Sequence, residues 1–272
     1  MMECGWIAHG INGFLLDVYG VLYDSGSSDI AIDGSAEAVK KLKSAGIPLR
    51  ICSNTSSKTS QMVAAALTSL GFEISLDEVF TPIPAVKQYL RQNMLRPYVI
   101  VDPAVEAEFN EFDQSDPNCV VLGDATTAFT YTRLNSAFRL LMQQPGIPLI
   151  TMGTGKYYKD VDGIMLDVGP FTKGLEYACG VEATVIGKPS KEFFMAALSS
   201  MNVDPQDAVM IGDDIVSDIS GAQACGVRGI QVRTGKYRPE DEPHPSIKPD
   251  AYVDNLLHAV DDFLTYSAKQ LT

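Results

Sequence analysis

Short apolar runs alternate with amphipathic stretches in the first third of the chain. Residues 13–17 are apolar up to a terminal acid and are predicted to form a buried strand, and the helical periodicity that follows stops at Gly46. A second strand is expected over 47–52 and a second amphipathic helix over 58–70. This order of strand, helix, strand and helix predicts a parallel sheet with right-handed crossovers.

The last third of the chain repeats the same pattern. Glycines close its apolar segments, and a serine stands where a helix needs an N-terminal cap. The segment SDISGAQACG is predicted to form one further short helix. The other expected elements are a strand over 183–186, a helix capped by Ser190, strands over 208–211 and 228–232, and a helix over 254–267.

The middle of the chain begins with the proline-rich TPIPAV and carries apolar runs of its own. Strands are expected in PYVIVD, NCVVLGD and IPLITMG, and a helix is expected around 131–142. These elements either continue the sheet of the outer thirds or form an inserted α/β domain. Periodicity alone does not choose between the two arrangements.

Composition narrows the class of protein. The chain has 272 residues, of which 46% are hydrophobic, so a sizeable core is expected. Its net charge of −13 argues against nucleic acid and against anionic membranes as partners, because an acidic surface gains nothing from either polyanion. No stretch has the length and apolarity of a membrane span, and MMECGWIAHG does not resemble a signal peptide.

The cysteines indicate a reducing compartment. There are five of them, an odd number, and no CxxC pair occurs. This usage favours reduced thiols in a cytosolic setting over disulfides or a zinc site. We expect a cytoplasmic location, with the nucleus as a second one.

Polar groups follow the predicted strands at four places: Asp17, the pair Ser53–Asn54, Lys188 and the pair Asp213–Asp214. Each group alone is ordinary, because turns and helix caps use the same residues. The carboxyl ends of parallel strands lie on one edge of a sheet, where ligands bind. If these strands are neighbours, the four groups converge on one pocket.

These residue types suit phosphoryl transfer. Asp17 is a carboxylate able to attack phosphorus. Two anions approach each other only when positive charge intervenes, which Mg²⁺ on Asp17 and Asp213 would supply together with Lys188. Ser53 and Asn54 offer donors to phosphate oxygens. Asp218, five residues after Asp213, either reaches waters on the metal or caps the following helix.

Four motifs, in this order, resemble the haloacid dehalogenase-like phosphotransferases: DVYGVL, ICSNTS, IGKP and IGDDIVSD. The resemblance implies a doubly wound, Rossmann-like α/β core, Mg²⁺ as cofactor and an aspartyl-phosphate mechanism. The long insertion between the second and third motifs resembles the branch with a large α/β cap. It implies a discontinuous core over 1–81 and 181–272 and a cap over 82–180.

Longer segments narrow the resemblance within this branch. DVYGVLYDSG, TMGTGKYYKDVDGIMLDVGPF, KGLEYACG and VRTGKYRPEDEPHP are similar to members that hydrolyse inorganic pyrophosphate, imidodiphosphate and the P–N bonds of phospholysine and phosphohistidine. The match spans essentially the whole chain. It implies small phosphorylated substrates or phosphorylated side chains as partners, and we expect a homodimer through apolar strands of the cap.

The resemblance assigns roles residue by residue. It makes Asp17 the nucleophile and Lys188 its catalytic partner, with metal ligands from the Asp17 and Asp213 side chains and the Tyr19 carbonyl. Asp214 and Asp218 support the metal. The substrate-binding positions are Asp17, Val18, Tyr19, Ser53, Asn54 and Lys188.

Tyr19 occupies the place where the broader family carries a second acid. That acid protonates the leaving group and later activates water, and a phenol with an ordinary pKa near 10 is a poor replacement. We therefore expect a restriction to leaving groups that need little protonation. Two alternatives stay open: a phosphomonoesterase such as a pyridoxal phosphate phosphatase, and a weakly active phosphate-binding scaffold. Lys236 and Arg238 either face the site entrance or solvate a loop.

Overall fold

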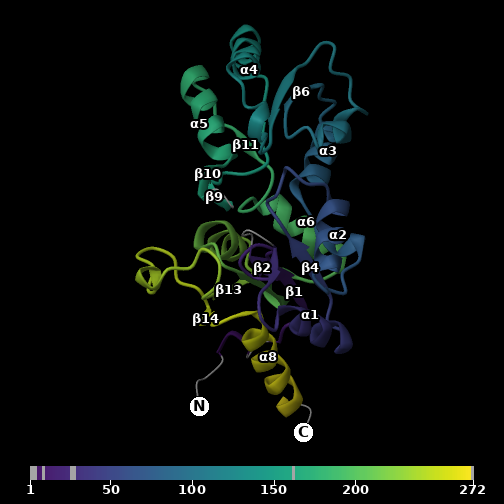
Figure 1. Ribbon diagram of the computed structural model, residues 1–272, viewed down its shortest axis with the longest axis vertical. Helices are drawn as coiled ribbons and strands as arrows, with labels where there is room; N and C mark the ends of the chain where they lie inside the picture. The colour runs from purple at the N-terminus through teal and green to yellow at the C-terminus, as the bar shows by residue number, and fades with distance from the viewer. Residues whose placement is uncertain (1–4, 8–9, 25–28, 161–162, 271–272) are drawn as a thin grey trace. The chain divides into compact units, whose positions relative to one another are not determined.

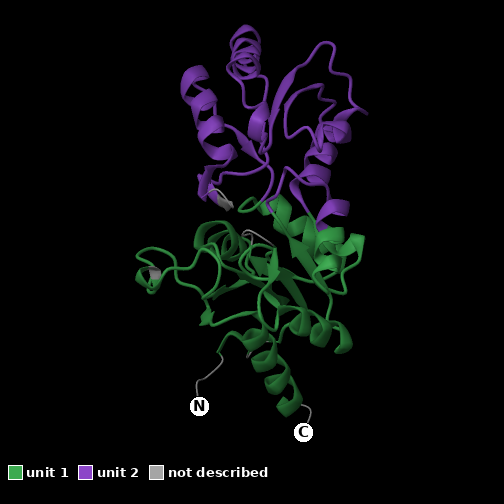
Figure 2. Cartoon of the chain, in the orientation of Figure 1, with its two compact units in different colours: residues 1–53, 64–80, 188–272 green, residues 54–63, 81–187 purple. Residues whose placement is uncertain are grey.

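The computed structural model describes residues 5–7, 10–24, 29–160 and 163–270. The chain divides into two compact units, shown in different colours in Figure 2. The predicted domain boundaries after residues 81 and 180 stay a prediction. Unit 1 comprises residues 1–53, 64–80 and 188–272, and unit 2 comprises residues 54–63 and 81–187.

Unit 1 is built on a six-stranded sheet in the order β14-β13-β12-β1-β4-β5, and every pairing in it is parallel (Figure 1). The central strand therefore comes from the start of the chain and pairs on one side with a strand from the last third. The strands are β1 (Gly13–Leu16), β4 (Leu49–Cys52), β5 (Val79–Phe80), β12 (Ala208–Gly212), β13 (Arg228–Val232) and β14 (Ala251–Val253).

Helices cover both faces of this sheet, because successive residues of a strand point to opposite sides. Phe14 of β1 packs edge-to-face on Phe263 of α8, with ring centroids 5.1 Å apart. Its neighbour Leu15 lies in a buried cluster with Phe193 and Phe194 of α6. One face thus carries α1 (Ser35–Ser44) and α8 (Leu256–Gln270), and the other carries α6 (Lys191–Met201) and α7 (Gly221–Ala224).

One helical segment of unit 1 differs from expectation. SDISGAQACG was expected to form a single short helix, but a π-helical turn over Ile215–Ser220 precedes α7. The carbonyl of Asp214 accepts from the N–H groups of both Asp218 and Ile219, which widens the first turn. The smaller elements of unit 1 include the antiparallel pair β2 (Tyr23–Asp24) and β3 (Ile30–Ala31). Helix α2 (Ser60–Ser69) contributes residues to both units.

Unit 2 has its own four-stranded parallel sheet, in the order β11-β8-β7-β6. An antiparallel hairpin of β9 and β10 lies outside that sheet. The strands are β6 (Pro97–Ile100), β7 (Cys119–Leu122), β8 (Leu149–Thr151), β9 (Tyr157–Asp160), β10 (Gly163–Leu166) and β11 (Thr184–Val185). The helices are α3 (Pro82–Gln92), α4 (Tyr131–Gln143) and α5 (Val168–Cys179).

The two faces of this second sheet also carry separate cores. Val121 of β7 packs in a cluster with Val86 and Leu90 of α3. Its neighbour Val120 packs in another cluster with Leu141 of α4 and Leu175 of α5. The expected doubly wound α/β fold is therefore confirmed for this chain. Among the described residues no helix combines the length and apolarity that crossing a bilayer requires.

Candidate active site

Three neighbouring strands of unit 1 each end in a polar residue. Asp17 follows β1, Ser53 follows β4 and Asp213 follows β12. The N–H of Asp17 donates to the carbonyl of Ile211 at 3.0 Å, which extends the β1–β12 ladder by one residue. The N–H of Ser53 likewise donates to Phe80 at 2.9 Å. Because the strands are parallel, all three residues lie at the carboxyl edge of the sheet.

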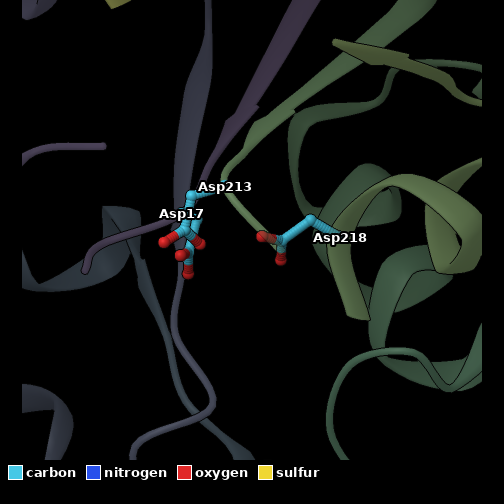
Figure 3. Close-up of side chains that lie close together, drawn as sticks. All are labelled: Asp17, Asp213 and Asp218. Carbon is cyan, nitrogen blue, oxygen red and sulfur yellow. The ribbon is translucent and has the colours of Figure 1, made fainter. Parts of the chain in front are cut away.

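The carboxylates of Asp17, Asp213 and Asp218 form a buried cluster at this edge. One oxygen from each lies within 4.8 Å of the others, and the side chains point toward one another (Figure 3). All three residues are less than 9% exposed. Asp218 was predicted only as a supporting residue, but the helical segment after β12 brings it as close as the other two.

Lys188 is the cation of this cluster. Its ammonium lies 2.5 Å from Asp17 Oδ1 and 2.7 Å from Asp218 Oδ1, and its side chain is only 2% exposed. Burial alone would lower the pKa of Lys188, but attraction to the two carboxylates outweighs it and raises the pKa. One lysine therefore neutralises only part of the charge of three buried acids.

The remaining negative charge raises the pKa values of two of the acids. Burial, followed by repulsion from Asp17, raises the pKa of Asp218 to about 7, although Lys188 opposes the shift. Burial and repulsion from Asp17 and Asp218 raise the pKa of Asp213 well above its usual range. Clustered carboxylate oxygens with excess negative charge suit a hard divalent cation, so this donor set fits a metal ion.

Two glycines beside Asp213 have no side chain in the space that its carboxylate occupies. Gly20 and Gly235 have φ values of 78° and 63°, and a Cβ at either position would overlap the Oδ2 atom of Asp213. The same oxygen accepts from the backbone N–H of Lys236 at 2.7 Å. Thr234 Oγ1 donates to the carbonyl of Gly20 at 2.5 Å, which ties the loop after β13 to the loop after β1.

Lys236 also contacts the acid that follows Asp213. Its ammonium lies 3.0 Å from Asp214 Oδ2, while Asp214 Oδ1 accepts from the N–H groups of Val216 and Ser217. Burial would raise the pKa of Asp214, but Lys236 and these hydrogen bonds lower it. The sequence left Lys236 undecided between site and loop, because its partners are more than 20 residues away. Arg238 is exposed.

The loop after Asp17 is tightly bonded. The carbonyl of the buried Val18 accepts from the N–H groups of Leu22 at 2.9 Å and Tyr23 at 3.3 Å. Tyr19 is half-buried, and its ring centroid lies 5.0 Å from that of Tyr23. Burial and the hydrogen-bonded phenol of Tyr19 raise the pKa of Tyr23. The Tyr19 ring therefore packs against its neighbour. The metal-binding role of its carbonyl stays a prediction.

Asn54 is the first residue of unit 2 and is not part of the cluster in unit 1. Its side-chain oxygen lies beside Gly187, whose φ of 147° and missing side chain leave space for it. A chain with a Cβ at residue 187 would place that atom 3.1 Å from Asn54 Oδ1. The phosphate-binding roles expected for Ser53 and Asn54 stay predictions.

Unit 2 has a separate group of acids at the carboxyl edge of its own sheet. Asp102 and Asp124 follow β6 and β7, and Thr126 Oγ1 donates to Asp102 Oδ2 at 2.7 Å. Burial, followed by repulsion from Asp167, raises the pKa of Asp124 to about 6. Asp167 itself caps α5 by accepting from the N–H of Val168. The sequence analysis did not single out Asp102 or Asp124.

Comparison with known proteins assigns this arrangement to a family. The model of the haloacid dehalogenase-like hydrolases matches residues 14–115, and a HAD-hydrolase-like model matches residues 185–259. The chain is 52% identical to the human phospholysine phosphohistidine inorganic pyrophosphate phosphatase, over 96% of this chain and 97% of that protein. The chain belongs to the haloacid dehalogenase-like hydrolase family.

Further relatives agree with this membership. The protein of the same name from Danio rerio is 51% identical, over 94% of this chain and 95% of its own length. Among solved structures, a 4-nitrophenylphosphatase from Thermotoga maritima superimposes with a TM-score of 0.85 at 25% identity, covering 93% and 97% of the two chains. The predicted family, fold and enzyme class, a phosphatase of this haloacid dehalogenase-like family, are confirmed.

Proposed function

We propose that this chain is a Mg²⁺-dependent phosphatase that forms an aspartyl-phosphate on Asp17 and hydrolyses P–O–P and P–N bonds. The substrates are inorganic pyrophosphate, imidodiphosphate, and phospholysine or phosphohistidine. The observation that carries the proposal is the buried cluster of Asp17, Lys188, Asp213 and Asp218 at a strand-terminal edge. The names of relatives about 50% identical over nearly the full length support the choice of substrates.

The chemistry follows from the residues at this edge. An oxygen of Asp17 attacks phosphorus, and the bond from phosphorus to the leaving group breaks. Lys188 lies against Asp17 and counters the charge that builds up as two anions meet. Asp17, Asp213 and Asp218 would hold Mg²⁺, which supplies further positive charge when bound. Water then hydrolyses the aspartyl-phosphate and restores the carboxylate of Asp17.

Tyr19 restricts the leaving groups that this site accepts. Its phenol stands where a carboxylic acid would protonate a departing alkoxide, and the ring packs against that of Tyr23. A departing phosphate, or an imidazole or amine that already carries its proton on nitrogen, needs a proton from this position less than an alkoxide does. The loss of an acid–base group typically slows a reaction by about 10²–10⁴-fold. The loss therefore falls mainly on ordinary alkyl phosphate esters.

A substrate panel with Mg²⁺ and with a chelator tests the proposal. We expect kcat/KM for pyrophosphate and imidodiphosphate to exceed that for an alkyl phosphate such as glycerol phosphate by at least about tenfold. The chelator and the Asp17→Asn variant should each abolish turnover. Faster hydrolysis of the alkyl ester would instead support a phosphomonoesterase, and undiminished turnover by Asp17→Asn would exclude the aspartyl-phosphate.

The hairpin of unit 2 supports a further proposal, that the protein forms a homodimer through its cap. All four residues of β10 are exposed, and three of them are large and apolar: Ile164 (73% exposed), Met165 (42%) and Leu166 (62%). An apolar strand exposed in this way is a common pairing surface. Light scattering should give twice the chain mass for the wild type and a single chain mass for Ile164→Glu with Leu166→Glu.

A further inference from the structure

The site described above has a second basic residue with no assigned role. Lys236 stands in the loop after β13, two strands away from β1 in the same sheet. Its backbone N–H holds Asp213 Oδ2 at 2.7 Å, and its ammonium lies 3.0 Å from Asp214 Oδ2. Burial alone would lower the pKa of Lys236, but attraction to Asp214, Asp213 and, more weakly, Asp17 outweighs burial and raises the pKa.

Lys188 and Lys236 differ in what they are free to reach. The Lys188 side chain is 2% exposed and lies between two carboxylates, so it is committed to the nucleophile. The Lys236 side chain is 54% exposed, so a ligand that enters from solvent can reach it. If that ammonium moved to a ligand, the Asp214 carboxylate would still have hydrogen-bond partners. Its other oxygen, Oδ1, accepts from two backbone N–H groups.

A substrate with two phosphoryl groups needs such a cation. One phosphoryl group is transferred to Asp17, while the other leaves as a phosphate carrying about two negative charges at neutral pH. The site that would hold that dianion already contains the carboxylates of Asp213 and Asp214, and the protein has a net charge of −13. Without a nearby cation, repulsion would disfavour both the binding of the second phosphoryl group and the charge that develops on it.

We propose that the Lys236 ammonium binds the leaving phosphoryl group of pyrophosphate and thereby sets the preference of this site for substrates with two phosphoryl groups. Asp17 forms a bond to the first phosphorus, and the bridging P–O bond breaks with its electron pair on the departing oxygen. Lys236 neutralises part of that charge through the peripheral oxygens of the leaving phosphate. Water then cleaves the aspartyl-phosphate, giving a second phosphate and one proton. The inference rests on the function proposed above.

The test compares two substrates on one variant. Pyrophosphate has a second phosphoryl group, whereas 4-nitrophenyl phosphate has an aryl leaving group and none. Lys236→Gln removes the charge but keeps the backbone N–H that holds Asp213. We expect kcat/KM for pyrophosphate to fall about 10–100-fold, the usual effect of losing a hydrogen bond to a charged group, and that for 4-nitrophenyl phosphate to change less than about threefold.

Two further variants complete the design. Lys236→Arg retains the charge and should recover most of the pyrophosphate activity. Lys40→Gln makes the same change in net charge at an exposed position of α1 and should leave both substrates unaffected. Equal losses on both substrates in Lys236→Gln, or no loss on pyrophosphate, would overturn the proposal. A wild-type protein that does not hydrolyse pyrophosphate at all would instead refute the proposed function itself, so the two failures are distinguishable.

Discussion

At the scale of single residues, the proposed function makes Tyr19 decisive, because it stands where the broader family carries an acid. Its ring packs against that of Tyr23, with the ring centroids 5.0 Å apart. We expect Tyr19→Asp to raise kcat/KM for alkyl phosphates by about 10²-fold, because a carboxyl group there protonates an alkoxide. Parallel kinetics on glycerol phosphate and pyrophosphate measure the change. Tyr19→Phe keeps the ring without the hydroxyl and should show no gain, and an unchanged alkyl rate in Tyr19→Asp would contradict this account.

Asp124 of unit 2 should make the stability of the protein depend on pH. Its pKa in the folded chain is raised to about 6, so the stability it contributes is complete below about pH 4 and is lost as the pH rises through 6. Asp124→Asn should therefore raise the melting temperature at pH 8, by an amount equivalent to about 1–2 kcal/mol, and give no gain at pH 4. Scanning calorimetry at both pH values provides the measurement.

The matched control for this effect is Glu182→Gln, which removes an exposed acid from the same unit. It should change the melting temperature little at either pH, as surface substitutions usually do. A gain for Asp124→Asn that is equal at pH 4 and pH 8 would show that the charge of Asp124 is not its cause.

At the scale of elements, the buried strands of the core were predictable because short apolar runs that end in a polar residue are typical of buried strands. The strands that precede Asp17 and Asp213 and the helix capped by Ser190 are all found where the pattern places them. No element was predicted over the β9–β10 hairpin, because its exposed apolar residues follow neither strand nor helix periodicity. The π-helical turn was missed because a shared carbonyl, and no residue pattern, sets its pitch.

Residue patterns along the chain also decide which residues of the site could be predicted from the sequence. Residues that directly follow strands, such as Asp17 and Asp213, carry their position in the motif itself. The contribution of Lys236 and Gly235 depends on their approach to Asp213, and that contact joins loops from two different strands. A spacing pattern along the chain contains no information about such a contact.

The loop after β1 and the loop after β13 should be sensitive to any added side chain. Gly20→Ala places a Cβ against the Asp213 carboxylate, so we expect kcat/KM for pyrophosphate to fall at least about tenfold. Gly46→Ala is the control, because Gly46 has a similar φ of 71° but nothing within 4 Å of its added Cβ. Both variants should lose about 1 kcal/mol of stability through backbone strain. Equal activity in both variants would show that the close approach of Gly20 does not position Asp213.

At the scale of the whole molecule, the uncompensated charge of the cluster links metal binding to stability. Three buried carboxylates with one lysine repel one another, so an ion that binds only the folded chain should stabilise it. We expect saturating Mg²⁺ to raise the melting temperature by several degrees, and excess chelator to reverse the shift. Asp213→Asn removes one ligand and one charge and should abolish most of the shift at matched ionic strength. A shift of the same size in that variant would place the binding elsewhere.

The pairing of β1 with β12 also fixes an order of events during synthesis. Gly13 lies opposite Ala208 in the register, so the strand that leads to Asp17 has one edge open until nearly four-fifths of the chain has been made. The four strands of the second sheet, by contrast, all lie within residues 97–185. Each of them therefore has its pairing strands at an earlier stage of synthesis. A nascent or truncated chain therefore completes the second sheet before the first, and no fragment that ends before Asp213 has the carboxylate cluster.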